Sequence, residues 1–246
     1  MSNLPLLKLE NISKSFGGFK ALKEVNLEVH NREVIGLIGD NGAGKTTLLN
    51  IIMGILQPDA GKIYFEGREV RISSPQEARN LGIEMVHQNL GDLITNFSIV
   101  NNFFLGKELC RKVGFLSILD RRTMNEIVMK RINDVGIKLR TPNQDLAVLS
   151  GGEKQAVAIA RCMHFGSKLL LLDEPTSALS VKETDKVLRV VEQARDQNGL
   201  SVIFVSHLLT HVYTVSDRIV VLAKGEKIAD LKKEETSVAE MTRMIS

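Results

Sequence analysis

The chain has 246 residues, of which 43% are hydrophobic and 25% charged, and its formal net charge is +3. This length suits one large domain, or one domain with an inserted lobe, and the composition is that of an ordinary globular protein. The mild charge and the lack of any run of five like charges exclude the usual signs of nucleic-acid binding, so we expect no nucleic-acid partner.

The sequence features that bear on localisation are weak, and they favour the cytosol. Cys110 and Cys162 are far apart and match no metal-binding spacing, so we expect free thiols in a reducing, cytosolic environment. The first residues, "MSNLPLLKLE", do not have the basic leader and long apolar core of a secretory signal. No apolar run approaches the ~20 residues that a membrane helix needs, so any membrane association is expected to come through a partner.

Strand patterns and helix patterns alternate along the first part of the chain. "LLKLENISKSF" and "LKEVNLEVH" alternate apolar and polar residues, which predicts strands buried on one face. "EVIGLIG" (33–39) predicts a short buried strand that ends at a glycine, and "LLNIIMGIL" predicts a helix that continues until Pro58. A strand in "GKIYFEG", a short capped helix in "SPQEARNLG" and a buried strand in "IEMVHQ" are expected to follow.

Helical patterns dominate from about Asn89 to Phe165. In "RRTMNEIVMKRINDVGI" the apolar residues fall on one helical face, namely Met124, Ile127, Val128, Ile132 and Val135. We interpret 89–165 as a helical lobe inserted into a single domain (1–246), whose α/β core is formed by 1–88 and 166–246. The alternative is an ordinary run of helices lying on that core.

The α/β pattern resumes after this lobe. "KLLLLDEP" predicts a buried strand, a helix is expected from roughly Lys182 to Asn198, and "LSVIFVSH" predicts another buried strand. "RIVVLAKGEKIADL" predicts a closing hairpin that turns at Gly225. Strands that alternate with helices imply a mostly parallel sheet, which binds ligands at the carboxyl ends of its strands.

The strongest motif is a phosphate-binding loop, "GDNGAGKTT", placed after a predicted strand and before a predicted helix. Its glycines let backbone N–H groups turn around phosphates, Lys45 supplies charge to the β- and γ-phosphates, and Thr46 supplies a hydroxyl ligand for Mg²⁺. The expected nucleotide-binding residues here are Gly39, Asp40, Asn41, Gly42, Ala43, Gly44, Lys45, Thr46 and Thr47.

An acidic pair, Asp173 and Glu174, ends the strand "LLLLDE". The first carboxylate can hold Mg²⁺ and the second can orient or deprotonate an attacking water. The alternative, an acidic pair placed only to suit a helix dipole, loses force because the phosphate loop lies in the same α/β pattern.

A second glycine pair lies in "LSGGEKQ" (149–155). Ser150 and Glu153 form S-x-x-E, which predicts a capping box at a helix start. The box leaves Gly151 and Gly152 unexplained, because glycine in a helix costs up to about 1 kcal/mol relative to alanine. The glycines suggest that another group approaches closely, and an anion is the natural candidate.

Taken together, these motifs resemble the ATP-binding subunits of ABC transporters over essentially the whole chain. "GDNGAGKTT" is similar to that family's Walker A, "LLLLDE" to its Walker B with the catalytic glutamate, and "LSGGEKQ" to its signature. Further positions match the Q-loop glutamine (Gln88, also near the metal), the switch histidine (His207), the adenine-stacking aromatic (Phe16) and the D-loop ("SALS", 177–180). The resemblance implies a P-loop NTPase (RecA-like) α/β core, an N-terminal antiparallel β subdomain and an inserted α-helical subdomain.

The resemblance also implies a mechanism. Two subunits dock head-to-tail, so Ser150, Gly151, Gly152 and Glu153 face the partner's ATP; Glu174 acts as base and His207 contacts the γ-phosphate. The cofactors are ATP and Mg²⁺. Two positions depart from the family: Glu153 stands where glutamine is commoner, and Ser180 stands where the D-loop usually ends in aspartate, which puts the usual cross-talk between sites in doubt.

"IEMVHQNL", "NNFFLGKE" and "SFGGFKAL" are similar to the ATPases of bacterial simple-sugar importers of the ribose, xylose and fructose type. The implied partners are integral membrane permease subunits, a second copy or a related ATPase subunit and, indirectly, a periplasmic or extracellular substrate-binding protein. The implied location is peripheral, on the cytoplasmic face of the inner membrane. The alternatives are an ABC ATPase of another substrate class, such as an amino-acid importer or an exporter, and a soluble ABC ATPase outside transport.

Overall fold

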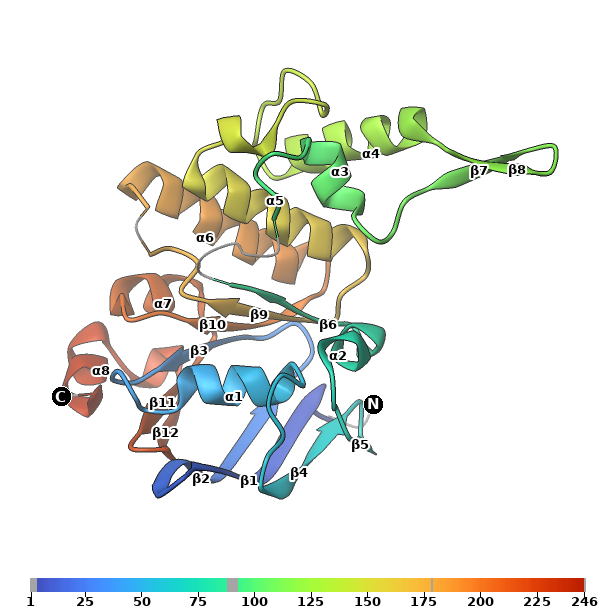
Figure 1. Cartoon of the computed structure of the whole chain (residues 1–246). Coiled ribbons are helices and arrows are strands. Elements are labelled where there is room, and N and C mark those ends of the chain that lie inside the picture. The colour runs from blue at the N-terminus through green and yellow to red at the C-terminus, as the bar shows by residue number, and fades with distance from the viewer. Residues whose placement is uncertain (1–3, 88–92, 178, 246) are drawn as a thin grey trace.

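A six-stranded sheet forms the centre of the molecule, which we describe from a computed structural model covering residues 4–87, 93–177 and 179–245 (Figure 1). The strand order is β12-β11-β3-β10-β9-β6. Neighbouring strands run parallel except at the edge, where β12 pairs antiparallel with β11. The strands are β3 (Val34–Ile38), β6 (Ile83–Val86), β9 (Leu169–Asp173), β10 (Ser201–Val205), β11 (Arg218–Ala223) and β12 (Glu226–Lys232). The mostly parallel sheet predicted from the sequence is confirmed.

The apolar runs of the central strands are explained by helices on both faces of the sheet. Along β3, Val34 and Ile38 pack in one hydrophobic cluster and Ile35 and Leu37 in another, so successive side chains serve opposite faces. Figure 1 shows α1 on one side of the sheet and α5 and α6 on the other. A strand covered on both sides needs no polar face, which is why these segments read as continuous apolar runs.

A four-stranded antiparallel sheet, in the order β2-β1-β4-β5, lies beneath α1 (Figure 1). It contains β1 (Leu7–Phe16), β2 (Phe19–Val29), β4 (Ala60–Phe65) and β5 (Arg68–Val70). Its alternating residues Leu7, Leu9 and Leu27 are buried in the same cluster as Leu48 and Leu49 of α1. The predicted antiparallel subdomain is thereby confirmed.

The helices are α1 (Lys45–Ile52), α2 (Pro75–Leu81), α3 (Ile99–Phe104), α4 (Arg121–Asp134), α5 (Gly151–His164), α6 (Val181–Asp196), α7 (Leu209–Val215) and α8 (Val238–Ile245), with 3₁₀ turns at Leu146–Val148 and Lys233–Glu235. The capped helix predicted at 74–82 is confirmed, because Ser74 accepts a hydrogen bond from Glu77 and Gly82 ends the helix in the left-handed conformation. The prediction that α1 runs to Pro58 is wrong. The helix stops at Ile52, and Gly54, at φ 73°, turns the chain.

The segment 89–165 contains α3, α4 and α5, and α4 buries Met124, Val128 and Ile132 as its spacing predicts. It also contains a β-hairpin that the sequence did not predict, β7 (Cys110–Val113) and β8 (Leu116–Leu119), which projects from the molecule (Figure 1). The limits of the lobe, 89–165, stay a prediction. Within the described ranges, no helix combines the length and apolar character needed to cross a bilayer.

Candidate active site

The phosphate loop connects the carboxyl end of β3 to the start of α1. Gly39, Gly42 and Gly44 have φ angles of 150°, 80° and 106°. A Cβ on Gly39 would lie 2.2 Å from the carbonyl oxygen of Leu222, and one on Gly44 would lie 2.7 Å from that of Ala21. Both positions therefore require glycine. No side chain caps α1 at Gly44, which leaves the first N–H groups of this helix available to an anion.

Lys45 is held across this loop. Its Nζ donates hydrogen bonds to the carbonyl oxygens of Gly39 (2.7 Å) and Asp40 (3.0 Å). Burial lowers the pKa of Lys45, while the negative charges of Glu174, Asp173 and Asp40 oppose that shift. The ammonium group thus lies between the loop and the acidic pair, where it can neutralise phosphate charge.

The acidic pair occupies the carboxyl end of β9. Burial raises the pKa of Asp173, and the neighbouring charge of Glu174 raises it further, against the charges of His87 and Lys45. Glu174 follows the strand with φ 53°, in the left-handed region that non-glycine residues seldom adopt. This backbone turn takes Glu174 out of the line of the strand, at the edge where parallel sheets bind their ligands.

The Glu174 carboxylate is positioned by the end of the neighbouring strand, β10. Ser206 Oγ donates a hydrogen bond to Glu174 Oε2 (3.2 Å), and His207 Nδ1 lies 2.9 Å from the same oxygen. Because β9 and β10 are parallel neighbours, the two residues that follow β10 come beside the residue that follows β9. The structure thereby brings together Glu174 and His207, which the sequence had singled out separately.

Ser206 is a residue that the sequence analysis missed. It is fully buried, and its hydroxyl also accepts a hydrogen bond from the backbone N–H of Leu208 (3.1 Å). Ser206 therefore holds the Glu174 carboxylate and, through Leu208, the backbone that follows His207. The available signal was a hydroxyl residue placed directly after a buried apolar strand.

Two hollows adjoin the phosphate loop. The first, of about 480 Å³, is lined by Gly39, Asp40 and Asn41 of the loop, by the group Glu174, Ser206 and His207, and by Leu209 and Ile245. The second, of about 220 Å³, is lined by loop residues 41–47, Ala21 and two half-exposed phenylalanines, Phe16 and Phe19. Phe16 thus lies beside the loop as expected. Phe19 was not singled out, and Gln88 falls outside the described residues.

The signature segment forms the start of α5. Its predicted capping box is confirmed: Glu153 Oε2 accepts from the Ser150 N–H (3.0 Å) and Ser150 Oγ from the Glu153 N–H (3.4 Å). A Cβ on Gly151 would lie 2.9 Å from Leu179, and one on Gly152 would lie 2.8 Å from Glu183 Cβ. The group that approaches these glycines within the chain is thus the start of α6. The described residues that line the two loop hollows include none of Ser150 to Glu153.

The parallel sheet, the phosphate loop at its central strand and the carboxylates on the adjacent strand define a P-loop nucleotide-binding protein. Comparison with known families narrows the class, because the ABC transporter family matches residues 22–177. The chain belongs to the ABC transporter family.

Its relatives include the xylose/arabinose import ATP-binding protein of Sulfolobus acidocaldarius, 43% identical over 98% of this chain and 94% of that protein. The fructose import ATP-binding protein of Rhizobium meliloti is 37% identical over 98% of this chain and 93% of that protein. The ribose import ATP-binding protein of Yersinia pestis is 38% identical, and this chain spans 47% of its length.

Solved structures with the same fold include a nucleotide-free ATP-binding cassette from an ABC transporter, with a TM-score of 0.82 and 26% identity over 97% of this chain and 99% of that one. Another is a dimeric cassette in a post-hydrolysis state bound to ADP and Pi, with a TM-score of 0.76 and 27% identity over 92% of this chain and 98% of that one.

Proposed function

We propose that this chain is the ATP-hydrolysing subunit of a membrane importer for a simple sugar. The observation that carries the proposal is the similarity to two import ATP-binding proteins, one for xylose/arabinose and one for fructose, over more than 90% of each protein. The order of phosphate loop, signature, acidic pair and histidine along the chain agrees with that similarity.

ATP binds along the phosphate loop in this proposal. Lys45 binds the β- and γ-phosphates from its place above the loop, and the first turn of α1 receives the phosphate oxygens. Phe16, half exposed beside residues 41–47, offers an aromatic face to the adenine. Phe19 lines the same hollow and is a second candidate for that contact.

Thr46 and Asp173 are suited to hold Mg²⁺, and the family resemblance implies Gln88 as a further ligand. Among the described residues, no cluster of three or more His, Cys, Asp and Glu side chains could cage a metal ion. This fits Mg²⁺, which binds through one or two protein oxygens and takes its other ligands from water and phosphate. When bound, the ion neutralises charge on the phosphates.

Glu174 is the general base that takes the proton of the attacking water. Ser206 holds its carboxylate at the hollow beside the loop, and His207, on the same oxygen, is placed to contact the γ-phosphate. A base must lie in hydrogen-bond reach of the water, so the fixing of Glu174 by its neighbours favours the reaction.

A second subunit completes the site. Ser150, Gly151, Gly152 and Glu153 then bind the γ-phosphate of ATP held on the other subunit's phosphate loop, a role compatible with their absence from the described lining of this chain's own loop hollows. The similar cassette solved as a dimer with ADP and Pi supports this arrangement. ATP stabilises the closed pair, and its hydrolysis removes the γ-phosphate contact and reopens it.

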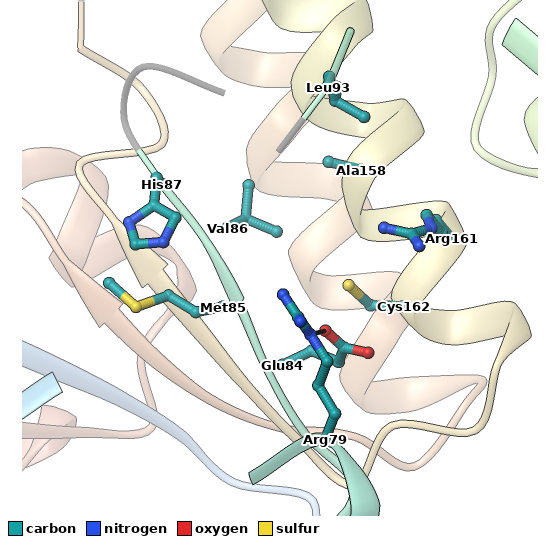
Figure 2. Close-up of a pocket in the computed structure, with 9 residues that line it drawn as sticks. All are labelled: Arg79, Glu84, Met85, Val86, His87, Leu93, Ala158, Arg161 and Cys162. Atoms are coloured by element: carbon teal, nitrogen blue, oxygen red, sulfur yellow. Dashed lines mark hydrogen bonds and ion pairs between the residues drawn. The ribbon is translucent and has the colours of Figure 1, made fainter. Parts of the chain in front are cut away.

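In this proposal the chain lies peripherally on the cytoplasmic face of the membrane, and the permease contacts it beside the small pocket of about 30 Å³ between β6 and α5. Figure 2 shows this pocket, where the ion pair Arg79–Glu84 (3.4 Å) lies at one side and Arg161 at the other. Its remaining lining is mostly apolar: Met85, Val86, Leu93, Ala158 and Cys162, with His87. A substrate-binding protein outside the membrane acts on the chain only through the permease.

Reconstitution tests the function. The chain is assembled with its permease in proteoliposomes, and ATP hydrolysis is measured with a xylose-, ribose- or fructose-loaded binding protein and with a binding protein that lacks sugar. We expect hydrolysis to rise with one loaded sugar. Hydrolysis that responds to an amino acid and to none of these sugars would reject the substrate class.

A further inference from the structure

The β7–β8 hairpin has no part in the nucleotide site, yet it projects from the molecule (Figure 1). Four backbone pairs join its strands, from Cys110 with Leu119 to Val113 with Leu116. Gly114 has φ 61° and Phe115 has no positive φ, the pattern of a two-residue turn with glycine first. This turn fits the twist of the strands and holds Phe115 at the tip.

The base of the hairpin is anchored to the helical subdomain. Arg161 on α5 donates hydrogen bonds to the carbonyl oxygens of Phe103 (3.0 Å) and Leu105 (2.9 Å), just before the hairpin. Leu109 and Leu119, at the ends of the two strands, pack against the hydrophobic core, and the N–H of Asp120 donates to the Leu109 carbonyl oxygen (2.7 Å). The base of the hairpin is therefore held by the helical subdomain, and the tip extends away from it.

The tip exposes apolar side chains that its fold does not need. Phe115 is 98% exposed, and Leu116 and Ile118 on β8 are 54% and 42% exposed. Tight turns are usually made from glycine, asparagine, aspartate or serine, and an aromatic ring adds nothing to such a turn. Three neighbouring apolar side chains on a projection mark a contact with an apolar medium or partner.

The charged residues near the tip indicate which kind of surface it can bind. Arg111 and Lys112 are exposed on β7, whereas the acidic residues Glu108 and Asp120 flank the base of the hairpin. From Leu109 to Leu119 the sequence has no acidic residue. An aromatic and aliphatic tip with cations behind it is complementary to a bilayer surface that carries anionic phospholipids.

The size of the tip also favours a lipid surface over a protein. A stable protein interface covers about 800 Å² on each partner, which a turn and two strands of four residues do not supply by themselves. Contact with a bilayer needs only that apolar groups reach about 5–10 Å into the interface, and four residues of strand span about 13 Å.

We propose that the β7–β8 hairpin binds directly to the bilayer, with Phe115 and Leu116 in the interfacial layer and Arg111 and Lys112 against anionic headgroups. This contact goes beyond the proposed function because it belongs to the chain alone and needs neither a permease nor ATP. It also revises the expectation that this chain reaches the membrane only through a partner.

Tryptophan fluorescence tests the contact, because the chain contains no tryptophan. The variant Phe115→Trp is mixed with vesicles of phosphatidylcholine alone or of phosphatidylcholine and phosphatidylglycerol in equal parts. We expect a blue-shifted emission, quenched by brominated acyl chains, with the anionic vesicles and a much smaller change with the neutral ones. Ile228→Trp, at a 51% exposed position on β12, is the matched control and should respond to neither.

Cosedimentation gives a second readout. Phe115→Ser should lower partitioning onto anionic vesicles by about tenfold, and Arg111→Gln with Lys112→Gln should remove the preference for phosphatidylglycerol. An emission that ignores both vesicle types overturns the proposal, as does one that changes only in proteoliposomes holding the permease, which would indicate a protein contact. ATP hydrolysis by the isolated variants reports on the nucleotide site separately.

Discussion

Gly152 has an observed packing role against α6 and a proposed role toward the ATP of a second subunit. From the sequence, two glycines in a first helical turn indicated a close approach, and an anion was the natural candidate. The structure shows a protein group that approaches from within the chain, because Glu183 lies where a Gly152 side chain would be. The role of the pair toward the ATP of a second subunit stays a proposal, whereas its packing against α6 already requires glycine.

Gly152→Ala should therefore lower the free energy of unfolding by about 1–3 kcal/mol, although alanine is the better helix former. The added Cβ would lie 2.8 Å from Glu183 Cβ and 3.3 Å from its Cα, so the start of α6 must shift. Urea unfolding measures the change. Gly18→Ala is the control, since a Cβ there meets nothing within 4 Å and the backbone φ is ordinary. Equal stability of the two variants would contradict the packing argument.

Residues with strong motif signals were predictable one by one. Lys45 and Glu174 were named from local motifs and His207 from the family resemblance, and the structure places all three at the same edge of the sheet. Ser206 and Phe19 were not named, because a buried serine or a strand phenylalanine has no local signal. Their importance comes only from β9 and β10 lying side by side and from β2 passing the phosphate loop.

At the scale of elements, the starts of α5 and α6 are tied together by one carboxylate. Glu183 Oε2 accepts from the Ser180 N–H (3.0 Å) and from Ser180 Oγ (2.7 Å), and its Oε1 lies 3.5 Å from the Gly152 N. These bonds from Ser180, with one from the Ser150 hydroxyl, lower the pKa of Glu183 to about 2. Ser180 replaces the usual D-loop aspartate, and a carboxylate is nevertheless present three residues later.

The lowered pKa predicts a pH-dependent stability. Because the folded value is about 2 and the ordinary value is 4.5, the Glu183 contribution is complete above pH 4.5 and is lost as the pH falls toward 2. The Tm of the native chain should exceed that of Glu183→Gln at pH 6, and this gap should narrow by pH 3. Scanning calorimetry at both pH values measures it. A gap that stays constant would show that the Glu183 charge makes no such contribution.

Helices and strands were predictable where burial of one face imposes a regular pattern of apolar residues on the sequence. The central strands, α2 and α4 follow from apolar runs, caps and periodicity. The hairpin β7–β8 was not predicted because most of its side chains face solvent. Burial therefore imposes no alternation of apolar and polar residues on its sequence. The end of α1 was misplaced because the apolar run continues through Gly54, and α8 was overlooked although Ser237 and Glu240 form its capping hydrogen bonds.

At the scale of the whole molecule, the phosphate loop and the signature lie apart. The phosphate loop, Asp173, Glu174 and His207 meet at one edge of the sheet, whereas the signature at the start of α5 lines neither hollow beside that loop among the described residues. In the proposed function, such a chain requires the signature of a second subunit for hydrolysis. The arrangement was predictable only from the resemblance, because no spacing within one chain reveals which residues meet across two.

In the proposed function Glu174 acts as the base in a site closed by two subunits, and Glu174→Gln tests this role most directly. The substitution keeps the shape of the side chain and removes its charge. With ATP and Mg²⁺, we expect the variant to sediment as an ATP-bound dimer while its hydrolysis is nearly abolished. Glu126→Gln, on the exposed face of α4, should behave as the native chain. A Glu174→Gln variant that hydrolyses ATP at the native rate, or that stays monomeric with ATP, would contradict the account.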